Sequence, residues 1–199
     1  MKQIIIATKN KGKAIEFKQF FSDYGIEAMS LLDMQGDIPD VEETGTTFEE
    51  NAALKAEQMA SLFDKPVLAD DSGLMIDALD GRPGIYSARY AGEPKSDQAN
   101  MNKVLEELTA FTALEERTAR FVCVLAIAVP GEKTIFRKGY CEGTIAFSEA
   151  GENGFGYDPV FIPKGYQETM AQLSAGVKNS ISHRKNAILH LDEWIQDIL

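Results

Sequence analysis

Residues 120–129 read Arg-Phe-Val-Cys-Val-Leu-Ala-Ile-Ala-Val, a continuous apolar run after the arginine and rich in β-branched side chains. Such a run is expected of a strand that is buried on both faces of a sheet. Pro130-Gly131 then predicts a turn, and Lys133–Lys138 and Tyr140–Phe147 predict two further strands around Gly139. We therefore expect an antiparallel section in the middle of the chain.

Helix and strand signals alternate on either side of this section. The predicted strands are residues 1–8, 66–69 and 160–162, and the predicted helices are centred on 14–21, 52–63, 101–108 and 182–195. Thr47-Phe48-Glu49-Glu50 has the form of a capping box, with Thr47 as N-cap and Glu50 at the third helical position. The pattern predicts an α/β fold with a mixed sheet, and no repeat or linker divides residues 1–199 into more than one domain.

Composition restricts the classes of function. The 199 residues include 20 Lys and Arg against 31 Asp and Glu, a net charge of −11, and 44% are hydrophobic. This balance disfavours disorder and a nucleic-acid polymer as partner, since the latter draws on many basic residues. The apolar runs are shorter than a membrane helix of roughly 20 residues, and the start is too soon polar for a signal peptide. We interpret Cys123 and Cys141 as reduced core residues of a cytoplasmic protein.

Several common catalytic motifs are missing. Gly12-Lys13 is followed by Ala14, which excludes a P-loop, and Gly154-Phe155-Gly156 lacks the third glycine of a dinucleotide fingerprint. Ser72 does not lie in a G-x-S-x-G elbow, which disfavours a serine hydrolase.

The first positive signal is Thr8-Lys9-Asn10-Lys11-Gly12-Lys13, which joins a predicted strand to a predicted helix. Backbone N–H groups and the helix dipole favour an anion there, and Lys13 adds a full positive charge. A solvated lysine-rich turn is the alternative interpretation.

The second signal is Asp70-Asp71, at the end of an apolar strand and before a Ser72-Gly73 turn. Adjacent carboxylates repel each other unless a cation compensates them, and hard oxygen ligands suit Mg²⁺. We favour a Mg²⁺ site over a solvated Asx-type turn, with Glu42-Glu43 as the source of another carboxylate.

Three weaker signals are ambiguous by themselves. Asn51 and Lys55 are one helical turn apart, which also describes an exposed stripe. Phe155 and Tyr157, near Asp158 in a glycine-rich loop, suit either base stacking or core packing. Ser182-His183-Arg184 opens the last predicted helix, where Ser182 is explained as a cap and the cations suggest a nearby anion or electron-rich partner.

Taken in order, these segments resemble one known family. The matching segments are Thr8-x-Asn10-x-x-Lys13, Glu42-Glu43-Thr44-Gly45-x-Thr47-Phe48-x-Glu50-Asn51-Ala52-x-x-Lys55-Ala56, Ala69-Asp70-Asp71-Ser72-Gly73-Leu74, Pro83-Gly84-Ile85-Tyr86-Ser87-Ala88-Arg89-Tyr90, Gly154-Phe155-Gly156-Tyr157-Asp158-Pro159 and Ser182-His183-Arg184. The series strongly resembles the inosine triphosphate pyrophosphatases, the Ham1-like dITP/XTP pyrophosphatase family, from Thr8 to Ala187. The first loop is more basic than in many relatives, and Ala175-Gly176-Val177 lacks the acidic residues often found there.

The resemblance implies a long curved mixed sheet flanked by helices, with two lobes, an active-site cleft between them and usually a homodimer. It implies Mg²⁺-dependent hydrolysis of ITP, dITP, XTP or dXTP to the monophosphate and pyrophosphate, which removes deaminated purines from the nucleotide pool. Two alternatives are a non-catalytic purine nucleotide sensor and a related pyrophosphatase for modified pyrimidine nucleotides.

The resemblance also implies a set of site residues. Asp71, Lys13 and Lys55 are expected to be catalytic, with Asp70 supporting them. Glu42 and Asp71 are expected to hold Mg²⁺. Glu43 is the metal ligand instead of Glu42 if the match to the family is shifted by one residue within Glu42-Glu43. The substrate-binding residues are expected to be Thr8, Asn10, Lys13, Asn51, Lys55, Ser72, Phe155, Gly156, Tyr157, Asp158, Lys178, His183 and Arg184. Among these, Lys178, His183 and Arg184 are expected to read the base, with Phe155 stacked on it.

Overall fold

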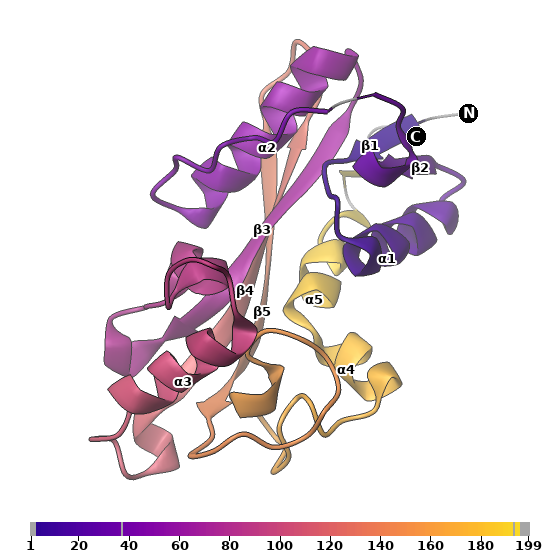
Figure 1. Ribbon diagram of the computed structural model, residues 1–199. Coiled ribbons are helices and arrows are strands. Elements are labelled where there is room, and N and C mark those ends of the chain that lie inside the picture. The colour runs from indigo at the N-terminus through magenta and orange to yellow at the C-terminus, as the bar shows by residue number, and fades with distance from the viewer. Residues whose placement is uncertain (1–2, 37, 193, 196–199) are drawn as a thin grey trace. The chain divides into compact units, whose positions relative to one another are not determined.

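A computed structural model describes residues 3–36, 38–192 and 194–195 of the chain (Figure 1). The strands are β1 (Gln3–Ile6), β2 (Glu27–Ser30), β3 (Val67–Ile76), β4 (Thr118–Ala128), β5 (Ile135–Ile145) and β6 (Phe161–Pro163). The α-helices are α1 (Lys11–Ser22), α2 (Phe48–Phe63), α3 (Asp97–Glu107), α4 (Ala175–Ile181) and α5 (His183–Leu189). None of the helices in these described ranges is long and apolar enough to cross a bilayer.

The six strands form one mixed sheet in the order β2-β1-β3-β4-β5-β6. β1 pairs in parallel with both β2 and β3, whereas β5 and β6 are antiparallel. The predicted α/β class and mixed sheet are therefore confirmed. β4 contains the long apolar run, and its residues from Phe121 to Ala128 are all buried.

Two predicted strand boundaries are wrong. The segments on either side of Gly139 form a single strand, β5, because an isolated glycine weakens a strand without ending it. Ser72-Gly73 is not a turn, since β3 continues to Ile76 and buries Leu74 and Ile76 beyond the two aspartates. Asp70 and Asp71 therefore lie in the middle of a ten-residue strand.

The chain divides into two compact units, each built from segments that are distant in the sequence. The first unit comprises Met1–Asp71, Val124–Lys138 and Ala187–Leu199, and the second comprises Ser72–Cys123 and Gly139–Asn186. β3, β4 and β5 each contribute residues to both units.

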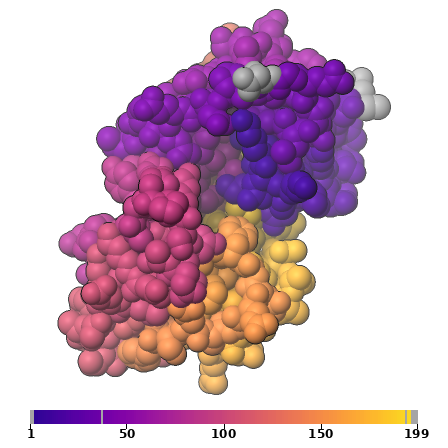
Figure 2. Space-filling model, viewed as in Figure 1, coloured from indigo at the N-terminus to yellow at the C-terminus, as the bar shows by residue number. Residues whose placement is uncertain are grey.

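In the first unit, α1 contacts β2, and Phe17 and Phe21 on α1 are fully buried. Residues 3–36 and 38–71 pack into one continuous body, coloured indigo to purple in Figure 2. Asn10 caps α1 by accepting a hydrogen bond from Lys13 N–H, and Thr47 caps α2 by accepting one from Glu50 N–H. Each such cap stabilises its helix by about 1 kcal/mol, so both helix starts are fixed locally.

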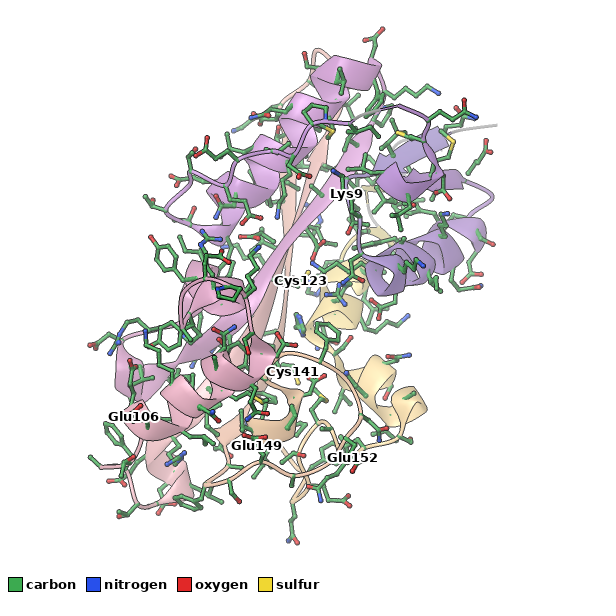
Figure 3. The ribbon with its side chains drawn as sticks, viewed as in Figure 1. Lys9, Glu106, Cys123, Cys141, Glu149 and Glu152 are labelled. Carbon is green, nitrogen blue, oxygen red and sulfur yellow. The ribbon has the colours of Figure 1, made fainter. Side chains whose placement is uncertain are left out.

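The second unit has its own apolar core, formed by α3 and the outer parts of the long strands. Its largest fully buried side chains include Leu74, Leu108 and Phe161. Cys123 on β4 and Cys141 on β5 are both buried, and both are reduced (Figure 3). The interpretation of both as core cysteines is confirmed.

Candidate active site

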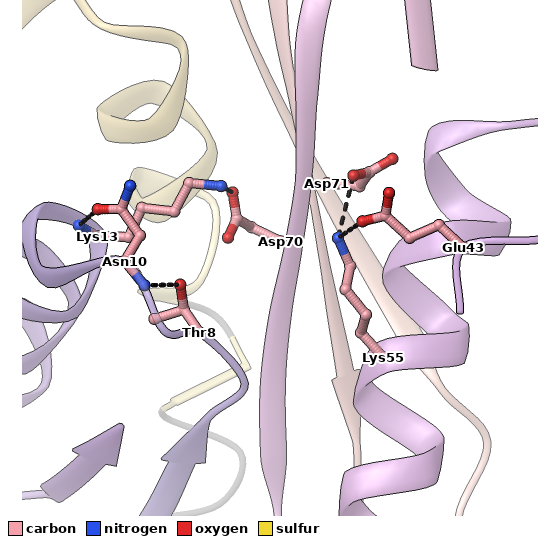
Figure 4. Close-up of polar contacts among 7 residues, drawn as sticks. All are labelled: Thr8, Asn10, Lys13, Glu43, Lys55, Asp70 and Asp71. Atoms are coloured by element: carbon pink, nitrogen blue, oxygen red, sulfur yellow. Dashed lines mark hydrogen bonds and ion pairs between the residues drawn. The ribbon is translucent and has the colours of Figure 1, made fainter. Parts of the chain in front are cut away.

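The alternation of side chains along β3 separates the two neighbouring aspartates. Successive residues of a strand point to opposite faces of its sheet. Asp70 therefore faces α1 and Asp71 faces α2, as Figure 4 shows. The two neighbours therefore point to opposite sides of the sheet.

On the Asp70 face, a lysine meets one carboxylate. Lys13 Nζ lies 2.6 Å from Asp70 Oδ2, and the two side chains are 21% and 3% exposed. The loop that carries Lys13 is shaped by local hydrogen bonds, because Asn10 N–H donates to Thr8 Oγ1 and Lys13 N–H donates to Asn10 Oδ1 (Figure 4). Ala7 N–H also donates to Leu68 O, which fastens the end of β1 to β3. One short connection thus carries Thr8, Asn10 and Lys13. A backbone hydrogen bond and the ion pair between Lys13 and Asp70 attach this connection to β3.

On the Asp71 face, one lysine is shared by two carboxylates. Lys55 Nζ lies 3.0 Å from Asp71 Oδ1 and 3.0 Å from Glu43 Oε1 (Figure 4). The lysine side chain is 17% exposed and that of Asp71 is 12% exposed. Two acids and one cation give this cluster a net negative charge.

The pKa values of this cluster follow from burial and charge. Burial raises the pKa of Asp71, and Glu43 and Asp70 raise it further against the opposing effect of Lys55. Burial by itself would lower the pKa of Lys55, but Asp71, Asp70 and Glu43 together raise it above the ordinary lysine value. Lys55 is therefore held as a cation, while ionised Asp71 is incompletely compensated.

The donor set suits a hard divalent cation. No group of three or more His, Cys, Asp or Glu side chains in the described ranges has the arrangement of a metal site. Mg²⁺, however, is commonly held by one or two carboxylates, with water and substrate phosphate as its other ligands. Glu43 and Asp71 supply two carboxylates on either side of the Lys55 ammonium group, where a positive charge is already stabilised. These two residues therefore fit Mg²⁺. Glu42 is exposed, and no described residue makes a hydrogen bond or ion pair with its carboxylate.

The predicted residues of the first unit fall into two groups, one on each face of β3. Lys55 and Asp71 meet directly, with Glu43 as their third member. Lys13 contacts Asp70 instead and lies on the other face of β3. Asn51 is not on an exposed stripe but is fully buried. The pairing of Lys13 with Asp70 was missed, because strand alternation separates the two aspartates but does not show which lysine meets each of them.

A second group of predicted residues forms a cluster within the second unit. Lys178 Nζ lies 2.5 Å from Asp158 Oδ2, and Phe155 N–H donates to the same oxygen at 3.0 Å. The ammonium group also lies 5.2 Å from the centre of the Phe155 ring, which is itself 63% exposed. Gly154 permits this arrangement, because a Cβ there would lie 2.1 Å from Asp158 Oδ2, and its φ is +91°. An exposed aromatic ring thus lies beside a positioned cation.

The remaining predicted residues of this unit have structural contacts. Tyr157 is buried, and its hydroxyl donates to Ser87 O, while burial raises its pKa. Gly156 N–H donates to Asp97 Oδ2. Ser72 belongs to β3.

Ser182 accepts a hydrogen bond from Lys185 N–H, as expected of a cap. Next to it, the His183 ring stacks on Phe121 with the ring centres 5.1 Å apart, and Arg184 is buried.

The whole chain is similar to known proteins. The model of the Ham1 family matches residues 4–194. The chain belongs to this family. A dITP/XTP pyrophosphatase of Oceanobacillus iheyensis is 64% identical over the full length of both chains. Another, from Shouchella clausii, is 54% identical and is matched over 100% of this chain and 98% of its own length.

Solved structures of Ham1 proteins have the same fold. The Ham1 protein of Staphylococcus aureus is 49% identical, with a TM-score of 0.90 over all of both chains. A HAM1 protein from Coxiella burnetii is 40% identical, with a TM-score of 0.91 over 99% of this chain and 100% of its own. The family resemblance found in the sequence is confirmed, as is its fold of a mixed sheet flanked by helices.

Proposed function

We propose that this Ham1-family protein hydrolyses non-standard purine nucleoside triphosphates, namely ITP, dITP, XTP and dXTP, to the monophosphate and pyrophosphate. The observation that carries the proposal is the meeting of Lys55 with Glu43 and Asp71, at 3.0 Å from each. This is an arrangement of cation and acids suited to a magnesium-bound triphosphate. The names of the full-length relatives, dITP/XTP pyrophosphatase, support the choice of substrate.

The reaction makes and breaks one bond each at the α-phosphorus. A water oxygen attacks that phosphorus and loses its proton to solvent, the bond to the bridging oxygen breaks, and pyrophosphate leaves with the bonding electrons. Negative charge accumulates on the leaving group, so positioned cations lower the barrier most. Lys55 and Lys13 are proposed to neutralise this charge, with Asn10 and Thr8 shaping the loop around the phosphates. Asp71 is proposed to orient the attacking water.

Asp71 and a glutamate of the preceding loop are proposed to hold Mg²⁺. The metal supplies further positive charge to the phosphate oxygens when it is bound. Glu43 is favoured over Glu42 as the second carboxylate, because Glu43 already shares a cation with Asp71 whereas Glu42 extends into solvent. A carboxylate that binds a metal is a weak base, so the part of Asp71 in accepting the water proton is secondary.

Purine selection is proposed to depend on residues of the second unit. Hypoxanthine and xanthine present an acceptor at position 6, where adenine presents a donor. Lys178, His183 and Arg184 are proposed to supply donors, with Ser72, Gly156, Tyr157 and Asp158 shaping the site and the exposed Phe155 ring stacking on the base. Each donor left unpaired against adenine costs about 1–3 kcal/mol. The contact of Lys178 with both Asp158 and the Phe155 ring supports this assignment.

Other properties are proposed from the same resemblance. We expect residues 1–199 to act as one domain and to form a homodimer. Two buried, reduced cysteines support a cytoplasmic location. The net charge of −11 supports nucleotides rather than a nucleic-acid polymer as partner.

A screen of nucleoside triphosphates with and without Mg²⁺, following pyrophosphate and orthophosphate separately, tests the proposal. We expect Mg²⁺-dependent pyrophosphate release, with kcat/KM for ITP about 10- to 100-fold above that for ATP, as one unpaired donor predicts. Equal values for ITP and ATP would overturn the donor-lined base site. Release of orthophosphate would indicate another hydrolase, and tight binding without turnover would indicate a nucleotide sensor. A preference for modified pyrimidine nucleotides would indicate the other pyrophosphatase class.

A further inference from the structure

Asn51 is a polar residue at a fully buried position of α2. Its side chain is 0% exposed, and it lies one helical turn before Lys55. Its Oδ1 accepts a hydrogen bond from Gly45 N–H at 2.8 Å. Its Nδ2 is buried and has no hydrogen-bond partner among the described residues. A buried donor without a partner lowers the stability of the fold. Any stabilising contribution of this amide therefore comes from the hydrogen bond that it accepts from residue 45.

Gly45 lies directly against the helix at this point. A Cβ on Gly45 would be 2.6 Å from Glu50 Cβ and 2.7 Å from Asn51 Oδ1. Such contacts cannot be accommodated without movement of the loop backbone. The backbone of residue 45 thus lies close enough to α2 to donate a hydrogen bond to the Asn51 side chain. Glycine permits this approach because it has no Cβ.

The same loop carries the acid that meets Lys55. Glu43 is two residues before Gly45, and its carboxylate lies 3.0 Å from Lys55 Nζ. On the other side of Gly45, Thr46 N–H and Thr46 Oγ1 both donate to Glu50 Oε2. The loop is therefore fastened to the first turn of α2 at residues 45 and 46, and Glu43 projects from the fastened end.

A substrate-binding role for Asn51 does not agree with its burial. A solute cannot contact a side chain of zero exposure unless the loop that covers it moves. We infer that Asn51 is a positioning residue, which holds Gly45 against α2 and thereby places Glu43 beside Lys55 and Asp71. This inference deepens the proposed function. Its expected effect on kcat rests on that function, whereas the anchoring of the loop at Gly45 does not.

Asn51→Leu is the central variant. It removes both polar groups at similar volume, so it eliminates the unsatisfied Nδ2 together with the bond to Gly45. Gly45→Ala displaces the same loop while residue 51 stays asparagine, and is the second route if Asn51→Leu does not fold. Asn51→Asp keeps an acceptor for Gly45 N–H. Asn100→Leu is the matched control, since Asn100 is a buried helical asparagine of the second unit whose Oδ1 accepts from Ala91 N–H at 2.7 Å.

The first readout needs neither substrate nor metal. Amide hydrogen exchange at Gly45 is expected to accelerate at least about 10-fold in Asn51→Leu, while Asn51→Asp keeps most of the protection and Asn100→Leu leaves it unchanged. Unchanged exchange at Gly45 in Asn51→Leu overturns the inference, whatever the enzyme's activity.

The second readout is kinetic. Asn51→Leu and Gly45→Ala are each expected to lower kcat for dITP about 10- to 100-fold and raise the Mg²⁺ concentration for half-maximal rate, while KM changes less than about 3-fold. The double variant is expected to be no worse than the poorer single variant, because both act through the same loop. Additive losses, or a KM effect larger than the kcat effect, would assign Asn51 to the substrate instead.

The two proposals fail in different ways. A wild-type protein without pyrophosphatase activity, but with Gly45 exchange that responds to Asn51→Leu, would refute the proposed function and keep the anchoring of the loop.

Discussion

Asp70 and Asp71 are consecutive residues of one strand, but their surroundings differ in charge. Asp70 pairs with Lys13, one acid with one cation, whereas Asp71 shares Lys55 with Glu43. In the first pair the charges balance, so its aspartate serves to hold a lysine in place. The second cluster has an excess of acid that a divalent cation would compensate. A one-residue step along β3 thus separates the partner of the lysine that we propose binds phosphate from the acids that we propose bind a metal.

Asp71→Asn tests this difference most strongly. We expect kcat for dITP to fall about 100- to 10,000-fold, the range for a positioned catalytic group, with a much smaller change in KM. Steady-state kinetics that follow pyrophosphate would measure it. Asp77→Asn, just beyond the end of β3 and paired with Arg120 at 3.0 Å, is the matched control. A near-normal kcat in Asp71→Asn would remove Asp71 from the mechanism.

Replacement of the two lysines compares the faces directly. Lys13→Ala and Lys55→Ala should both weaken triphosphate binding and slow the chemical step, lowering kcat/KM by about 10- to 150-fold, as the loss of a charge-assisted hydrogen bond predicts. We expect the larger effect in Lys55→Ala, because it leaves two acids rather than one to repel the phosphates.

Lys18→Ala is the control for these variants. Lys18 lies on α1 like Lys13, but pairs with the partly exposed Asp33 at 2.6 Å. Its removal should change kcat/KM less than about 2-fold. Equal losses in Lys13→Ala and Lys55→Ala would contradict the difference in charge balance between the faces.

The smallest expected effect is on stability, and its sign differs between the faces. Asp70→Asn removes the partner of Lys13 and should lower stability by about 2 kcal/mol, or Tm by roughly 4–8 °C. Asp71→Asn should instead raise Tm at pH 7 by about 2–4 °C, because burial raises the pKa of Asp71 and ionised Asp71 is therefore unfavourable in the folded state.

The pH dependence of that gain follows from the direction of the pKa shift. Folded Asp71 binds a proton more tightly than the unfolded chain does, so it reduces stability as pH rises above the ordinary aspartate pKa of about 3.9. The Tm advantage of Asp71→Asn should therefore disappear below about pH 3.5. Thermal unfolding of both variants from pH 3 to 7 would measure this, and a lower Tm for Asp71→Asn at pH 7 would show that Lys55 compensates Asp71 fully.

Sequence patterns predicted those parts of the fold that depend on local signals. The apolar run of β4 and the cap of α2 at Thr47 were both predicted, because each depends on a few adjacent residues. The extent of β3 was not. Asp, Ser and Gly in series favour a turn, and only burial of Leu74 and Ile76 in the second unit shows why the strand continues.

The residue types of the site were predictable, but their partners were not. Lys13 and Lys55 both follow from the family resemblance, yet which aspartate each contacts depends on the side of β3 on which its helix packs. Asn51 illustrates the same limit, because helical spacing places it near Lys55 but does not show that residue 45 covers it. The fold of the preceding loop back onto α2 buries this polar side chain, and helical spacing does not indicate that contact.

The buried thiols have a practical consequence for work on this protein. Burial raises the pKa of Cys141 to about 11, so at neutral pH this thiol is almost entirely protonated and unreactive. Cys123, the other cysteine of the sequence, is also buried. A cysteine introduced at the exposed Thr44 would therefore take up a spectroscopic label selectively in the otherwise native chain. Movements of the Glu43 loop during turnover could then be followed without first removing either natural sulfhydryl.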